Sequence, residues 1–187
     1  MGGLVSDLAL AFMLADVADT VTLKLWSPHG VASKTKADGT PVTTADGEAE
    51  DAILRAVGAV HPDDGFLGEE IGSRQSRNER RWIVDGIDGT SGYVAGLTTW
   101  GTLIALEQRG EIILGVVSSP AQDKRWWHDV TAERSLAHAN QTRTGIQSEC
   151  HPISALRPIE SLLCPSSMVS LAKIRLPSKM HFLDVLH

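Results

Sequence analysis

The chain has 187 residues with 17 Lys and Arg against 23 Asp and Glu, a net charge of −6, which argues against non-specific nucleic-acid binding. Hydrophobic residues make up 42% and charged residues 21%, a globular rather than a disordered composition. Two cysteines are too few for a disulfide framework and no apolar stretch is long enough to span a bilayer, so we expect a cytoplasmic protein.

Two amphipathic helices are expected in the first third of the chain. An N-cap pattern at Ser6 begins the first, Asp7–Leu25. The polar stretch Lys34–Thr44 predicts a loop or hairpin, and the second helix is expected over Thr44–Val60. The residues of the second helix expected to face inward are Ala49, Ala52, Ile53, Ala56 and Val60.

Short apolar or β-rich segments then predict strands. They are Phe66–Leu67, Trp82–Val84, Thr98–Glu107, Glu111–Ser118 and, as a further candidate, Lys124–Trp127. The charged segment Ser73–Arg81 predicts a loop. Helices first and consecutive strands later indicate a layered α+β or α/β fold. Because the pattern weakens beyond Asp129, we expect an α+β domain over 1–150 and a divergent or incomplete tail over 151–187.

Acidic side chains occur where the predicted elements begin or end. Asp46 lies at the start of the second helix, Glu69 and Glu70 follow one strand, and Asp85 and Asp88 follow another. Carboxylates at strand ends gather in the usual ligand site of open α/β sheets, and they repel one another unless a cation is present. Hard oxygen ligands favour Mg²⁺ or Ca²⁺ over zinc, so the pattern is typical of metal-assisted phosphoryl chemistry.

These carboxylates also have structural interpretations. Asp46 alone is a typical helix cap, and the pair Glu69–Glu70 is also typical of a solvated loop. The string Asp85–Thr90 is harder to explain in that way, because a plain turn needs one Asp-Gly pair rather than two carboxylates three residues apart.

Three ordered motifs carry a family resemblance. Trp82–Thr90 (WIVDGIDGT) resembles the inositol monophosphatase signature W-I-[IV]-D-P-I-D-G-T, and Lys36–Asp46 and Gly68–Glu70 resemble two further motifs of that family. The resemblance covers about residues 5–130 and implies an α+β fold, a layered αβαβα sandwich of the inositol-monophosphatase/sugar-phosphatase type. Thr99–Leu106 and Arg125–Trp127 look most similar to the histidinol-phosphate phosphatases within the family.

The resemblance implies a Mg²⁺-dependent phosphomonoesterase with two cations. Glu69, Asp85 and the backbone carbonyl of Ile87 would bind the first Mg²⁺, and Asp85 and Asp88 the second. Histidinol phosphate is the expected substrate, which would place the chain in histidine biosynthesis. Inositol-1-phosphate or a related sugar or nucleotide phosphate is the alternative.

The same resemblance assigns the remaining roles. Asp46 and Thr90, with Glu69, would act on the attacking water in an in-line displacement that needs no side-chain nucleophile. The residues implied in substrate binding are Lys36, Asp88, Gly89 and Thr90, the two last through backbone N–H groups. Taken alone, Lys36 is equally typical of a solvated loop. A small phosphorylated metabolite is the expected partner, with no nucleic acid and no membrane, and a homodimer is expected as the assembly.

The sequence departs from the family pattern at three places. Gly86 replaces the usual Pro, which we expect to loosen the segment around it, and Gly92 replaces the usual Asn. No W-D-x-A motif follows Trp127, although the family uses its Asp at the second cation and the substrate. We therefore expect an N-terminal portion of the fold, and a catalytically impaired remnant stays open as an alternative.

Other phosphate chemistries fit less well. A haloacid-dehalogenase-type phosphatase uses D-x-D-x-[TV], whereas Asp85 and Asp88 are separated by two residues. No G-x-x-x-x-G-K-[ST] occurs, which excludes a P-loop, and the 7 histidines show no zinc-site spacing.

Overall fold

The computed structural model describes residues 6–129. It begins with helix α1 (Asp7–Leu25), the strands β1 (Lys34–Thr35) and β2 (Pro41–Val42) of a small hairpin, and helix α2 (Thr44–Val60). The elements that follow are β3 (Gly65–Gly68), β4 (Ser73–Arg74), β5 (Arg80–Asp88), α3 (Thr90–Val94), β6 (Gly101–Gln108), β7 (Glu111–Ser119), the 3₁₀ turn η1 (Pro120–Gln122) and β8 (Lys124–Asp129). The predicted tail lies outside the described residues, so the domain division at residue 150 stays a prediction.

Both long helices have the predicted bounds because their caps and hydrophobic periods agree. The Ser6 side chain accepts the backbone N–H of Ala9 at 3.2 Å and begins α1. The inward face of α2 differs from the prediction at its end. Val60 is exposed, and Val57 is buried instead. Both residues share one face of the helix by spacing, so the exposure of Val60 goes with its position as the last residue of α2 and not with the helical period.

Six strands form one sheet in the order β4-β3-β5-β6-β7-β8. β3 and β5 run parallel and the other neighbours antiparallel. β5 continues through the Asp-Gly-Ile-Asp string to Asp88, with a register shift between Asp85 and Asp88, where the sequence predicted an end at Val84. β4 and the first residues of β5 also lie within Ser73–Arg81, which was predicted as a loop.

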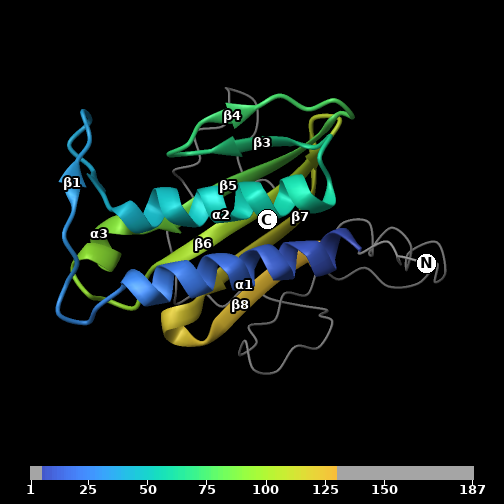
Figure 1. Ribbon diagram of the computed structural model, residues 1–187. Coiled ribbons are helices and arrows are strands. Elements are labelled where there is room, and N and C mark those ends of the chain that lie inside the picture. Colours follow the sequence, from blue (N-terminus) through green and yellow to red (C-terminus); the bar gives the residue numbers. More distant parts are fainter. Residues whose placement is uncertain (1–5, 130–187) are drawn as a thin grey trace.

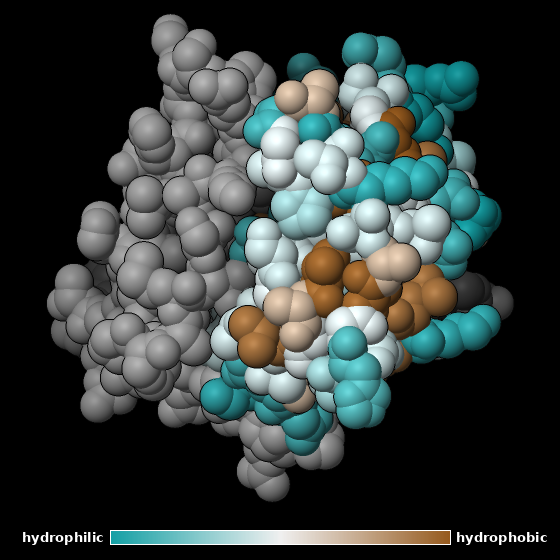
Figure 2. Space-filling view, turned by 90° about the vertical axis from the view of Figure 1, so that its left-hand side faces the viewer, coloured by the Kyte–Doolittle hydropathy of each residue, from teal (hydrophilic) through white to brown (hydrophobic). Residues whose placement is uncertain are grey.

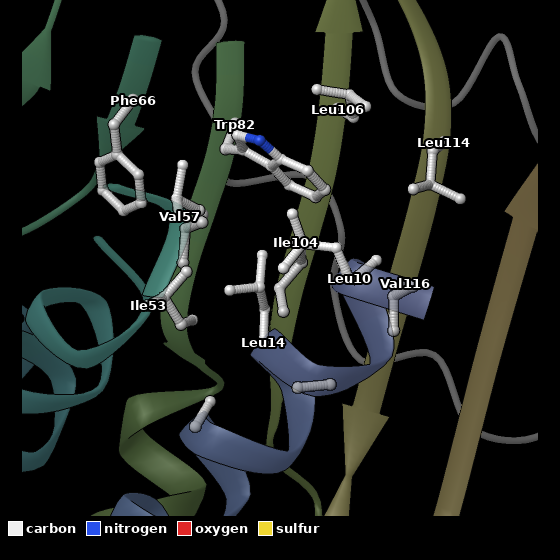
Figure 3. Packing of buried hydrophobic residues seen from close by; sticks show 14 of the residues in the cluster. Leu10, Leu14, Ile53, Val57, Phe66, Trp82, Ile104, Leu106, Leu114 and Val116 are labelled. Atoms are coloured by element: carbon white, nitrogen blue, oxygen red, sulfur yellow. The ribbon is translucent and has the colours of Figure 1, made fainter. Parts of the chain in front are cut away.

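The helices α1 and α2 lie side by side across one face of this sheet (Figure 1). Their apolar stripes meet alternate residues of the central strands in a single core (Figure 3). The labelled side chains of this core are Leu10, Leu14, Ile53, Val57, Phe66, Trp82, Ile104, Leu106, Leu114 and Val116. The packed helix layer and sheet confirm the layered α+β class.

The next residues along the strands alternate to the other face of the sheet. Ile83, Leu103 and Ala105 are also buried, so both faces of the central strands are covered. The further layers of the predicted αβαβα sandwich lie outside the described residues. Within residues 6–129, neither long helix is apolar enough over its length to cross a membrane.

Candidate active site

The predicted site residues lie at one end of the sheet. β3 and β5 are parallel, so their carboxyl ends lie at the same end of the sheet. Glu69 directly follows β3, and Asp85 and Asp88 lie in the last part of β5. The first turn of α2, which carries Asp46, lies there as well, and α3 follows β5 directly (Figure 1). Figure 2 views the molecule from this side, where hydrophilic side chains lie above and below a group of apolar ones. The topology therefore brings together four carboxylates that are far apart in the sequence.

Asp85 lies among other carboxylates in a buried position. It is 5% exposed, and its Oδ1 accepts the backbone N–H of Ile87 at 3.1 Å. Burial, followed by the charges of Glu69, Asp88, Glu50 and Asp46, raises the pKa of Asp85 to about 8. All of these effects disfavour the ionised form of Asp85. A bound cation would relieve them, so Asp85 is suited to be a cation ligand.

A second, smaller hydrophobic cluster supports the turn after β5. Ile87 packs there with Tyr93 and Trp100, whose rings meet edge to face with centroids 4.9 Å apart. Gly89 begins α3 with φ of 81°, and a Cβ at this position would lie 3.0 Å from the carbonyl oxygen of Thr99. A residue with a side chain would be strained here on both counts. Glycine avoids this strain and so allows the sharp turn directly after Asp88.

Asp46 both caps the first turn of α2 and contacts another residue of the site. It is the third residue of α2 rather than its N-cap, and its Oδ2 accepts the N–H and the hydroxyl of Thr43 at 2.9 and 2.6 Å in a capping box. Its Oδ1 accepts the hydroxyl of Thr90 at 3.2 Å. The same hydroxyl lies 3.0 Å from the carbonyl oxygen of Ile87. The predicted pairing of Asp46 with Thr90 is therefore present.

Lys36 reaches across from the β1–β2 hairpin to the end of β3. Its Nζ lies 2.7 Å from Glu69 and also pairs with Glu70. Burial acts to lower the pKa of Lys36, but the hydrogen bonds from its ammonium to both carboxylates outweigh that effect and raise it. The lysine is thus an ion-paired bridge rather than a solvated loop residue, and it places a positive charge beside the carboxylate cluster.

The donor set fits a hard divalent cation, although it is not assembled as a finished metal site. Within residues 6–129 no group of three or more His, Cys, Asp and Glu side chains is arranged to hold a metal ion. The carboxylate of Glu69 is 49% exposed and directed to Lys36, while Asp85 and Asp88 are buried. Carboxylate and carbonyl oxygens are the ligands that Mg²⁺ prefers, and their mutual repulsion is what a cation would relieve.

One buried side chain beside the site was missed by the sequence analysis. Glu50 accepts backbone N–H groups from Glu69, Glu70 and Ile71, and its charge also acts on Asp85. Burial raises the pKa of Glu50, and the hydrogen bonds from these amides oppose the rise. Its spacing of four residues from Asp46, on one face of α2, was the available signal.

Gly86, the first departure from the family pattern, is buried inside β5. Its carbonyl accepts the hydroxyl of Thr102 at 2.9 Å. A Cβ here would lie 2.5 Å from the carbonyl oxygen of Asp46, so the missing side chain lets α2 approach closely. Whether the substitution loosens the segment stays a prediction.

Comparisons with known proteins place the chain among phosphatases by sequence and fold. The model of the inositol monophosphatase family matches residues 5–171. A histidinol-phosphatase of Mycobacterium tuberculosis is 46% identical over 121 residues, which cover 65% of this chain and 46% of that protein. A histidinol-phosphatase of Streptomyces coelicolor is 41% identical over 143 residues, which cover 72% of this chain and 53% of that protein. The chain thus spans about half the length of these curated relatives.

Among solved structures, the IMPase of Thermotoga maritima matches with a TM-score of 0.60 at 28% identity. The match covers 65% of this chain and 47% of that structure. The predicted fold class is therefore confirmed by a solved structure as well as by the arrangement of helices and sheet.

Proposed function

This chain belongs to the inositol monophosphatase family, and on that premise we propose that it is a Mg²⁺-dependent phosphomonoesterase acting on histidinol phosphate. The names of the two curated relatives support this substrate. The observation that carries the activity is the buried carboxylate pair Asp85 and Asp88, placed beside Glu69 and the Asp46–Thr90 hydrogen bond.

We assign the cations to oxygen ligands at the ends of β3 and β5. Glu69, Asp85 and the carbonyl of Ile87 would hold one Mg²⁺, and Asp85 and Asp88 a second. When bound, the cations would lower the pKa of a water and balance the charge of the phosphate. Since Glu69 is paired with Lys36 in the structure, its carboxylate would turn from the ammonium toward Asp85 as the site fills.

The side chains of the site would then accept the proton of the attacking water and bind the substrate phosphate. Asp46 Oδ1, which accepts the Thr90 hydroxyl, is placed to receive a proton relayed through that hydroxyl from the attacking water. Once released from Glu69, Lys36 would supply a positive charge to the substrate phosphate. The remaining contacts proposed for the phosphate are the backbone N–H groups of Gly89 and Thr90, with Asp88 near the leaving group.

Inositol-1-phosphate is the second candidate substrate, because the Thermotoga structure carries the name IMPase. A protein that binds the cation without turnover is the third outcome, motivated by the absence of a W-D-x-A motif after Trp127. We further propose a cytoplasmic location and a small phosphorylated metabolite as the ligand. Independence from nucleic acid and membrane, and a homodimeric assembly, stay predictions.

The test is phosphate release from histidinol phosphate and from inositol-1-phosphate by the 187-residue chain with Mg²⁺. Asp85→Asn should reduce the rate by at least about 10²-fold, since an amide cannot supply the anionic ligand. Asp51→Asn, a change at an exposed carboxylate of α2, is the matched control and should keep the wild-type rate. A folded Asp85→Asn variant with the full rate would contradict the assignment, and a faster reaction with inositol-1-phosphate would replace the substrate.

A further inference from the structure

A buried carboxylate of α2 binds the loop that carries Glu69. Glu50 is 0% exposed. Its Oε1 accepts the N–H of Glu69 at 2.9 Å, and its Oε2 accepts the N–H groups of Glu70 and Ile71, each at 3.0 Å. Three consecutive amides therefore converge on one side chain, and they belong to the residues that directly follow β3.

The same side chain also packs against the other strand of the site. A Cβ on Gly68 would collide with the carboxylate of Glu50, and a Cβ on Gly86 would lie 3.2 Å from its Cγ. Glu50 thus contacts the residue before Glu69 and the residue after Asp85. It lies between the two strand ends whose carboxylates are the proposed cation ligands, and both glycines leave the space for it.

These contacts favour a carboxylate over a side-chain amide. All three partners are N–H donors, and a carboxylate is the side chain whose two oxygens only accept. A Gln at this position would direct an NH₂ group at one or two of the amides, so part of the loop would lose its bond. The negative charge also costs something locally, because it adds to the repulsion on Asp85.

We propose that Glu50 is a positioning residue for the cation site, which holds the backbone of residues 69–71 so that the Glu69 carboxylate can meet Asp85. The inference rests on the proposed function only in taking Glu69 and Asp85 as cation ligands. It does not depend on which phosphate monoester is hydrolysed, or on how fast.

The test compares the 187-residue wild-type chain, Glu50→Gln and Glu48→Gln. Glu48 is an exposed carboxylate two residues earlier on the same helix, so its variant loses the same charge without touching the loop. Mn²⁺ binding, measured without substrate by the electron paramagnetic resonance signal of the free ion, should weaken roughly 10- to 100-fold in Glu50→Gln. Glu48→Gln should bind as the wild type does.

Hydrogen exchange of the metal-free proteins supplies a readout that needs neither cation nor turnover. The amides of residues 69–71 should exchange faster in Glu50→Gln, while those in the middle of α1 keep their wild-type protection. Glu50→Asp retains an acceptor-only group on a shorter stem, so it should bind Mn²⁺ better than Glu50→Gln. This second variant also tests the idea if Glu50→Gln does not fold.

The outcomes separate this inference from the proposed activity. Mn²⁺ binding by the wild type without phosphatase turnover would overturn the activity and leave the role of Glu50 standing. Unchanged Mn²⁺ affinity in folded Glu50→Gln, or no recovery in Glu50→Asp, would overturn the role of Glu50 alone. Absence of Mn²⁺ binding by the wild type would overturn the cation site and this inference together.

Discussion

Buried carboxylates are accommodated differently in two regions of this protein. At the end of the core away from the site, Asp64 accepts the indole N–H of Trp82 at 2.9 Å and pairs with Arg80 at 3.3 Å. Between α1 and β8, Asp19 pairs with Arg125 at 2.7 Å and accepts the hydroxyl of Ser118 at 2.8 Å. Each of these acids has a cationic partner encoded in the chain.

Asp85 has the opposite surroundings. The charges that act on its pKa are those of four other carboxylates. For Asp19, burial also raises the pKa, but the hydrogen bond from Ser118 and the charge of Arg125 oppose it. Burial alone therefore does not mark a site. A buried carboxylate is a candidate ligand when its neighbours disfavour its negative charge, and a structural group when cationic or donor neighbours balance that charge.

The largest effect on stability is expected where a balanced pair is broken. The guanidinium of Arg125 is 1% exposed and joins β8 to α1 through Asp16 and Asp19. Arg125→Ala should lower the free energy of unfolding by about 3–5 kcal/mol, because it leaves a buried carboxylate without its cation. Urea denaturation measures this loss. Arg125→Lys, which keeps the charge, is the control and should lose less; equal losses would attribute the effect to packing instead.

A pH-dependent effect should distinguish the unbalanced carboxylate. The pKa of Asp85 is raised from 3.8 to about 8 in the folded protein, so folding is favoured while this group is protonated. Its contribution to stability is present in full below about pH 4 and is lost as the pH rises toward 8. The unfolding free energy of metal-free protein should decline over that window, and Asp85→Asn should flatten the decline.

The measurement is chemical denaturation in a chelator at several pH values. Mg²⁺ should restore wild-type stability near pH 8 and leave Asp85→Asn unchanged, since binding to the native state alone stabilises it. Parallel pH profiles for the two metal-free proteins would show that Asp85 titrates as an ordinary surface acid, and the contrast between the two regions would fail.

The smallest effect is expected at an exposed ion pair. Arg109 and Glu79 lie 3.1 Å apart, but their side chains are 77% and 71% exposed. Glu79→Gln should change the free energy of unfolding by no more than about 0.5 kcal/mol, because water screens the pair. Thermal or urea unfolding at neutral pH tests this. A loss comparable with that of Arg125→Ala would show that exposure does not separate the two classes of pair.

Local sequence patterns predicted much of this arrangement. Capping residues and helical periodicity determined the bounds of both long helices, and the hairpin of β6 and β7 followed from two β-rich runs around a short turn. The grouping of Glu69 with Asp85 and Asp88 followed from the position of acids after apolar strands. These features depend on interactions among near neighbours in the chain, which is why a single sequence carries them.

The errors arose where distant segments decide the outcome. The extension of β5 through Gly86 to Asp88 depends on pairing with β6, which no local pattern of turn residues discloses. Lys36 was open between a solvated and a site position until the β1–β2 hairpin was placed beside β3. Glu50 resembles any helical glutamate until the amides after β3 are brought to its carboxylate.

The long helices, most of the strands, the acidic motifs and hence the family followed from the sequence alone, since each depends on residues close together along the chain. Which acids are balanced by a cationic side chain and which are not depends on the tertiary structure. Pairing of β3 with β5 and packing of α2 on their ends set the distances between charges, and those distances decide whether a carboxylate meets an arginine of its own chain or is left for a cation.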